Sequence, residues 1–279
     1  RAGDVNKDGI GDIIIGTLPA VGGSASPRSA GVSYVVFGRS TVAYTASGYA
    51  CIDLLPFNTI GLFSGFAIIG GATGDQSGVS VSYAGDVNGD TIDDVIVGAY
   101  QASPVVGGAT RALAGAAYVL FGRTFLGVGA PAYYTNINLL PLTSAGSSLG
   151  FAILGAQASD FCGRSVSAAG DINGDGVDDV VVGAYLADPT VGGTTRADAG
   201  MVYVVFGRWY TTGFNAYANI DLFSIALTGS VLGFAMYGAE ASDNCGFYAT
   251  DAGDVNGDSI SDVVVGAFNA DPVVGGVMR

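Results

Sequence analysis

Four short loops in this sequence concentrate oxygen-bearing side chains at a fixed spacing. Each reads D-x-N-x-D-x-x-x-D, which places aspartate or asparagine at positions 1, 3, 5 and 9. Alternate residues of a tightly curled loop point inward, and carboxylate, amide and carbonyl oxygens are the ligands that a hard cation such as Ca²⁺ prefers. Three carboxylates so close together would repel one another unless a cation neutralised them. The spacing therefore predicts four bound Ca²⁺ ions, one per loop.

The predicted ligands are the side chains at positions 1, 3, 5 and 9 and the main-chain carbonyl at position 7. In chain order they are Asp4, Asn6, Asp8, Ile10 and Asp12; Asp86, Asn88, Asp90, Ile92 and Asp94; Asp171, Asn173, Asp175, Val177 and Asp179; and Asp254, Asn256, Asp258, Ile260 and Asp262. The alternative is that the Asn-Gly and Asp-Gly pairs form hairpin turns with solvated charge. Recurrence of the same oxygens in four loops favours the metal. An EF-hand is excluded because position 12 is Ile or Val, where that motif needs glutamate.

The loops belong to an internal repeat, since their first aspartates are 82, 85 and 83 residues apart. Each repeat contains four short apolar runs with a period of two, such as GVSVSYAGD, DDVIVGAY, GAAYVLFGR and GFAILGA. Such runs predict a four-stranded antiparallel sheet, which cannot bury both faces alone. Stacking the sheets around an axis gives an all-β propeller. We expect one array over residues 1–279, with approximate blades 1–74, 75–159, 160–242 and a half blade 243–279, closed only partially or by another copy.

Composition narrows the functional classes. Of the 279 residues, 49% are hydrophobic and 12% are charged, which is enough apolar side chains for a hydrophobic core. The net charge of −14 would repel nucleic acid. Gly, Asp or Asn interrupts the apolar runs well before the roughly 18 residues of a membrane-spanning helix. There is no histidine, which excludes Ser-His-Asp and Cys-His catalysis, and Glu240 is the only glutamate. We expect a protein that is not an enzyme.

The combination of GFAI(I/L)GA, SVS-AGDVNGDG-DDVVVGA and G-VYVVFG closely resembles the FG-GAP repeats of integrin alpha-subunit propellers and of bacterial extracellular proteins. The resemblance implies propeller blades with calcium held in the hairpin between the first and second strands. It also implies an extracellular or cell-surface adhesion or structural module that contacts a protein or glycan partner. Two alternatives are a filament subunit assembled from further copies through its open blade edges, and a propeller accessory region of a larger extracellular enzyme.

Arginines, tyrosines and cysteines outside the loops also recur. Two sets of arginines recur: Arg39, Arg123 and Arg208 follow an FG pair, and Arg28, Arg111 and Arg196 lie in one class of loop. Their guanidinium groups either face an acidic partner or, in the interpretation that we prefer, bind local carbonyl groups and nearby aspartates. Tyrosines of the long connections form a partner surface or cover blade edges; they are Tyr133, Tyr134, Tyr210 and Tyr217.

Cys162 and Cys245 occupy equivalent places in adjacent blades, too far apart to form a disulfide, whereas Cys51 aligns with Asn136 and Asn219. We expect Cys51 to pair with Cys162 or Cys245 of another copy.

Overall fold

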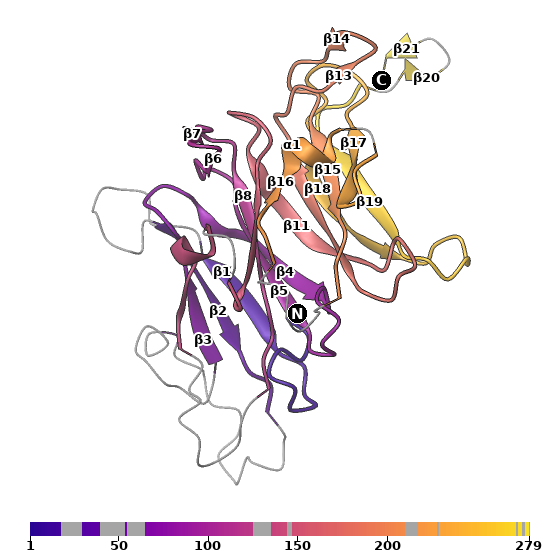
Figure 1. Ribbon diagram of the computed structural model, residues 1–279. Helices are drawn as coiled ribbons and strands as arrows, with labels where there is room; N and C mark the ends of the chain where they lie inside the picture. The colour runs from indigo at the N-terminus through magenta and orange to yellow at the C-terminus, as the bar shows by residue number, and fades with distance from the viewer. Residues whose placement is uncertain are drawn as a thin grey trace.

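The computed structural model of the chain describes residues 1–17, 30–39, 54, 65–124, 135–143, 147–209, 217–227, 229–271, 273–274 and 277–278. The protein is all-β, built from several antiparallel sheets that stand next to one another in chain order (Figure 1). This confirms the predicted fold class. None of the sheets closes on itself among the described residues. Within the same residues, no helix is long and apolar enough to cross a membrane.

The predicted four-strand repeat is present. First strands are β4 (Ser77–Gly85), β11 (Cys162–Gly170) and β18 (Cys245–Gly253). Second strands are β1 (Ile13–Thr17), β5 (Asp94–Ala99), β12 (Asp179–Ala184) and β19 (Asp262–Ala267). Third strands are β2 (Val32–Val36), β8 (Ala116–Leu120) and β15 (Met201–Val205), and fourth strands are β3 (Gly65–Ile69), β10 (Gly150–Leu154) and β17 (Gly233–Tyr237). Consecutive strands of each repeat pair antiparallel.

The sheets pack face to face, so the middle strands are buried on both sides. In β5, Val95 and Val97 belong to a core cluster shared with β2 and β3. The intervening Ile96 belongs to a second cluster, shared with β12 and β15. Because side chains alternate across a strand, one run of valine and isoleucine fills the space between two pairs of sheets. The apolar run that follows the second acidic loop therefore packs against the sheets on both sides of it.

Close packing explains the glycine near the end of each second strand. A Cβ atom on Gly98 would lie 2.1 Å from the carbonyl oxygen of Gly163, which belongs to the first strand of the next sheet. The same distance is 2.0 Å between Gly183 and Gly246. No side chain fits there, so the sequence VVGA or VIVGA keeps glycine where the neighbouring backbone passes.

Two kinds of connection contain additional strands. Between the second and third strands lie two-residue hairpins: β6 (Val105–Val106) with β7 (Ala109–Thr110), β13 (Thr190–Val191) with β14 (Thr194–Thr195), and β20 (Val273–Val274) with β21 (Val277–Met278). Gly107 and Gly108 connect the first hairpin with φ of 60° and 83°, the backbone that a type I′ turn requires.

The long connection between third and fourth strands contains a short segment that pairs with the preceding sheet. β9 (Ile137–Asn138) lies parallel to β3, and β16 (Ile220–Asp221) lies parallel to β10. The 3₁₀ helix η4 (Leu140–Thr143) follows β9, and helix α1 (Leu222–Ile225) follows β16. We predicted these connections only as loops of their own blades. In the structure the second and third repeats thus each contribute one strand to the sheet of the repeat before it.

Cys162 and Cys245 are both free and buried, which agrees with the prediction that they do not bond to each other. Burial raises the pKa of the thiol at both positions. Cys162 has no exposed surface, so a disulfide to another copy would require β11 to open. Cys51, Arg28, Tyr133, Tyr134 and Tyr210 lie outside the described residues.

Candidate metal-binding loops

Each acidic loop joins the first strand of a sheet to the second. The loop that begins at Asp86 leaves β4 and enters β5, and the loops at Asp171 and Asp254 occupy the same place between β11 and β12 and between β18 and β19. The loop at Asp4 precedes β1. Since the sheets stand side by side in the same orientation, the hairpin position predicted for calcium recurs in successive repeats.

The side chains at positions 1, 3 and 5 gather around the backbone amides of their own loop. In the second loop the Asp90 amide donates to Asp86 Oδ1 at 3.0 Å and to Asn88 Oδ1 at 2.8 Å. Asp86 Oδ2 accepts from the amide of Thr91 at 2.7 Å, and Asp90 Oδ1 from that of Ile92 at 2.9 Å. Oxygens from positions 1 and 3 that share one N–H group must be close neighbours.

The same pattern occurs in the other three loops. The position-5 amide donates to the oxygens of positions 1 and 3 at 3.0 and 2.9 Å in the first loop, 3.1 and 2.9 Å in the third, and 3.0 and 2.9 Å in the fourth. Three loops have glycine at position 4, and in the first loop Lys7 occupies that place with a left-handed φ of 56°. The sequence varies between the oxygens, but the loop conformation does not.

Position 9 behaves differently, because both of its carboxylate oxygens are bound by backbone amides. Asp94 accepts from Val87 at 3.0 Å and from Gly122 at 2.9 Å, and it has no exposed surface. Asp12 and Asp179 make the equivalent pairs, Asp12 with Val5 and Gly38, Asp179 with Ile172 and Gly207. This aspartate therefore ties the loop to the FG sequence that follows the third strand, a partner that the loop sequence does not indicate.

The position-9 carboxyl groups carry a shifted pKa. Burial raises the pKa of Asp12 to about 6 and that of Asp179 to about 7, and it raises the pKa of Asp94 well above its usual range. In all three, the carboxylates at positions 1 and 5 add a smaller upward shift by repulsion. These groups are near enough to influence one another, so a cation among them would lower the same pKa values.

The donor set suits a hard cation. Positions 1, 3 and 5 offer carboxylate and amide oxygens, which match calcium chemistry. Nevertheless, no cluster of three or more His, Cys, Asp or Glu side chains able to hold a metal ion occurs among the described residues. Position 9 directs one carboxylate oxygen to the position-2 amide of its own loop and the other to a glycine amide after the third strand. The ligand roles of positions 1, 3, 5, 7 and 9 all remain predictions.

Position 8 connects neighbouring loops, a role we missed. Asp93 Oδ2 accepts from the amide of Asp4 at 2.6 Å, and Asp178 Oδ2 accepts from the amide of Asp86 at 2.8 Å. Each bond joins position 8 of one loop to position 1 of the preceding loop. The only sequence signal was the Asp-Asp pair at positions 8 and 9 of the second and third loops, where the others have Gly11 and Ser261.

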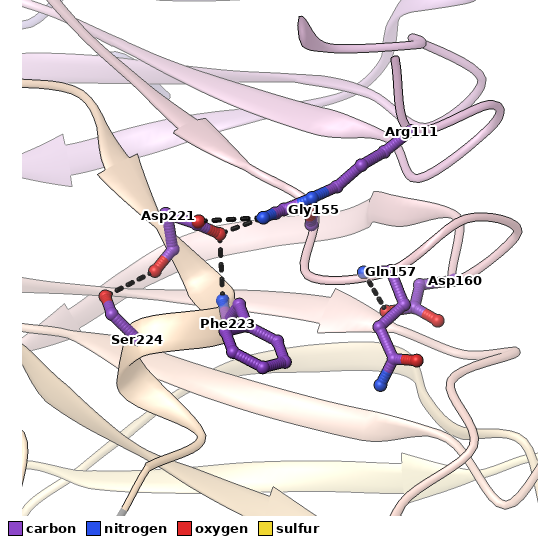
Figure 2. Close-up of polar contacts among 7 residues, drawn as sticks. All are labelled: Arg111, Gly155, Gln157, Asp160, Asp221, Phe223 and Ser224. Carbon is purple, nitrogen blue, oxygen red and sulfur yellow. Dashed lines mark hydrogen bonds and ion pairs between the residues drawn. The ribbon is translucent and has the colours of Figure 1, made fainter. Parts of the chain in front are cut away.

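The recurring arginines and Tyr217 have structural partners. Arg111 donates to the carbonyl of Gly155 and pairs with Asp221 (Figure 2), and Arg196 donates to the carbonyl of Gly238, as our preferred interpretation predicted. Tyr217 donates to the carbonyl of Arg208 and stacks on Phe151 with ring centroids 5.5 Å apart. It is thus part of the packing between sheets, so the partner-surface interpretation does not apply to this tyrosine.

Comparison with known families agrees with these features. A family model described as FG-GAP repeat matches residues 163–205, which run from β11 through the third acidic loop and β12 to β15. A search of curated proteins found no match to the chain. The matched segment contains the loop, the buried second strand and the third strand whose following FG sequence binds position 9. Residues 163–205 thus match an FG-GAP repeat, which supports an FG-GAP assignment for the repeat unit of this chain.

Proposed function

We propose that the four acidic loops bind calcium and that the chain is a non-catalytic structural or adhesion module that acts outside the cell. One observation supports the calcium sites most directly. In every loop the oxygens of positions 1 and 3 accept from the same backbone amide, which brings oxygen ligands of two side chains together without any charge to balance them. A divalent cation would supply that charge.

Within each loop, the side chains at positions 1, 3 and 5 would hold the ion. Asn88 is a loop residue that is only 3% exposed, whereas Asp90 is exposed and can adjust to the cation. The position-9 carboxylate would either bind the ion directly or fix the loop conformation through its two hydrogen bonds to backbone amides. Calcium sites of extracellular modules bind in the range of about 10⁻⁴ to 10⁻³ M, so the ion would occupy them outside the cell.

The experiment is calorimetric titration of the chelated chain with calcium. We expect four sites in the unaltered chain and three in Asp90→Ala, because that substitution removes a carboxylate from one loop only. Asp271→Asn is the control, since it neutralises an exposed aspartate outside the loops. Circular dichroism must show that all three proteins are folded. Absence of binding in the unaltered chain, or four sites in Asp90→Ala, would contradict the ligand assignment.

The extracellular and structural parts of the proposal rest on the repeat family. FG-GAP repeats are typical of extracellular proteins and are generally structural or binding modules. A protein or glycan partner would meet the connections between sheets. Retention of the secreted chain on cells or matrix in calcium, and its release by chelation, would support adhesion. Identical retention with and without calcium would contradict it.

A further inference from the structure

Two hydrogen bonds join the second acidic loop (86–94) directly to the third acidic loop (171–179). The amide of Asp86 donates to Asp178 Oδ2 at 2.8 Å, and the amide of Asp178 donates to the carbonyl of Asp86 at 3.2 Å. Asp86 is position 1 of its loop, and Asp178 directly precedes position 9 of the next loop. These bonds therefore connect two predicted cation sites.

The contact between these residues depends on a glycine. Gly85 directly precedes Asp86 and has a left-handed φ of 81°. A Cβ atom at residue 85 would collide with the carboxylate of Asp178. Any larger residue would therefore push that carboxylate away from the Asp86 amide. The glycine permits one loop to approach the other closely.

A second connection is the backbone of the segment Gly207-Arg208-Trp209, which follows β15. The Gly207 amide donates to Asp179 Oδ1 of the third loop at 2.9 Å. The next amide, that of Arg208, donates to the carbonyl of Val87 in the second loop at 2.9 Å. Consecutive amides of one segment thus hold position 9 of one loop and position 2 of the other.

The same segment places the only tryptophan of the chain, Trp209, between the two loops. Its ring packs on Gly89, since a Cβ atom added to that glycine would lie 2.5 Å from ring carbon Cε3. The ring nitrogen Nε1 donates to the carbonyl of Asp175 at 3.4 Å. The indole therefore contacts position 4 of the second loop and position 5 of the third.

Both backbone connections also occur between the first and second loops. The Asp4 amide donates to Asp93 Oδ2 at 2.6 Å, and the Arg123 amide donates to the carbonyl of Val5 at 2.8 Å. These four residues occupy the places that Asp86, Asp178, Arg208 and Val87 have in the next pair of loops. The connection is thus a property of the repeat.

We infer that the second and third loops bind divalent cations as a coupled pair, in which occupation of either loop raises the affinity of the other. The inference rests on the calcium binding proposed above and adds regulation to it. Asp86 is a predicted ligand, and its backbone holds Asp178. A loop held in its bound conformation therefore restrains its neighbour, which loses less conformational freedom when it binds in turn. By linkage the effect is the same in both directions.

Titration of the chelated 279-residue chain with Tb³⁺ tests the coupling. Tb³⁺ replaces Ca²⁺ at oxygen sites and luminesces when a nearby tryptophan is excited, so Trp209 makes it a probe of these two loops. In Asp90→Ala the signal comes from the third loop, and in Asp175→Ala it comes from the second. We expect the unaltered chain to saturate cooperatively, at a Tb³⁺ concentration at least about 2-fold lower than the sum of the two single-loop curves.

Asp178→Ala tests the connection itself, because it removes the acceptor of the Asp86 amide. In this background the curve should equal the sum of the two single-loop curves, since the loops then bind independently. Asp178→Asn retains an oxygen for the amide and should remain cooperative. The matched control is Asp93→Ala, which removes the same carboxylate at position 8 of the second loop, where it contacts the first loop. It should leave the second and third loops coupled.

Two measurements exclude trivial explanations. Circular dichroism in chelator must show that each variant is folded, and Trp209→Phe must abolish the luminescence while calorimetric calcium binding persists. Absence of Tb³⁺ and calcium binding in the unaltered chain would overturn both the proposed function and the coupling. Binding with additive curves in the unaltered chain, or full cooperativity in Asp178→Ala, would overturn the coupling alone.

Discussion

At the scale of single residues, the acidic loop divides its oxygens between two tasks. Positions 1, 3 and 5 face the loop, and position 9 binds one amide of its own loop and one amide beyond the third strand. The sequence alone predicted the first group, because spacing of two in a short loop is a local property. It could not reveal that Asp94 binds Gly122, since that glycine lies 28 residues away, after the third strand. The roles of Asp93 and Asp178 were hidden for the same reason, as their partners lie in another repeat.

Asp160 gives a prediction for pH. Its carboxylate is buried, accepts from the amide of Gln157, and has a pKa raised from 3.8 to about 7, mainly by burial. Asp188 adds to the rise and Arg111 opposes it. Because the folded state holds this proton more tightly than the unfolded state, Asp160 should lower stability progressively as pH rises from about 4 to about 7. Below that window its penalty is absent, and above it the penalty is complete.

Asp160→Asn keeps an oxygen for the Gln157 amide but cannot ionise. We expect it to be more stable than the unaltered chain at pH 8, by on the order of 1 kcal/mol or more, with the advantage lost at pH 4. Thermal unfolding at both pH values, in chelator throughout, measures the difference. Asp271→Asn, at an exposed site, controls for the loss of one negative charge. An advantage of Asp160→Asn that does not change with pH would rule out this explanation.

At the scale of elements, the period-two runs predicted the long strands, and those of the middle sheets, such as β5 and β12, are buried on both faces. The short strands β9 and β16 were missed, since two residues show no periodicity and their pairing partner lies in the preceding repeat. The sequence signal for these strands was the alignment of Cys51 with Asn136 and Asn219. It showed that a similar segment recurs in the long connection, but not that the segment pairs with a sheet.

Gly98 offers a test of how closely the blades approach. Gly98→Ala should destabilise the chain by about 1 to 3 kcal/mol, because the added methyl group would meet the carbonyl oxygen of Gly163 at 2.1 Å. Gly266→Ala is the matched control, since it has the same place in β19 but its nearest neighbour is 3.5 Å away. We expect the control to change stability by less than about 0.5 kcal/mol. Equal melting temperatures for the two variants would show that the sheets are less tightly packed.

At the scale of the whole molecule, the calcium proposal predicts stability that depends on the metal. An ion that binds only the folded state contributes about 2.7 kcal/mol per site at 100-fold saturation. Because the loops bind one another through Asp93 and Asp178, we expect removal of calcium to lower the melting temperature of the array as a unit. Calorimetry with calcium and with chelator measures this. Magnesium at equal concentration is the control, and an unchanged melting temperature on chelation would argue against the sites.

The short strands β9 and β16 also bear on synthesis of the protein. Each completes a sheet that was translated earlier, so on the ribosome the first and second sheets wait for the next repeat before their outer edges are covered. A growing chain therefore carries an unsatisfied edge with it, always on the most recently made blade, and such edges invite pairing with other strands. We expect nascent chains released within a repeat to aggregate more readily than those released just after residues 136–142 or 219–225.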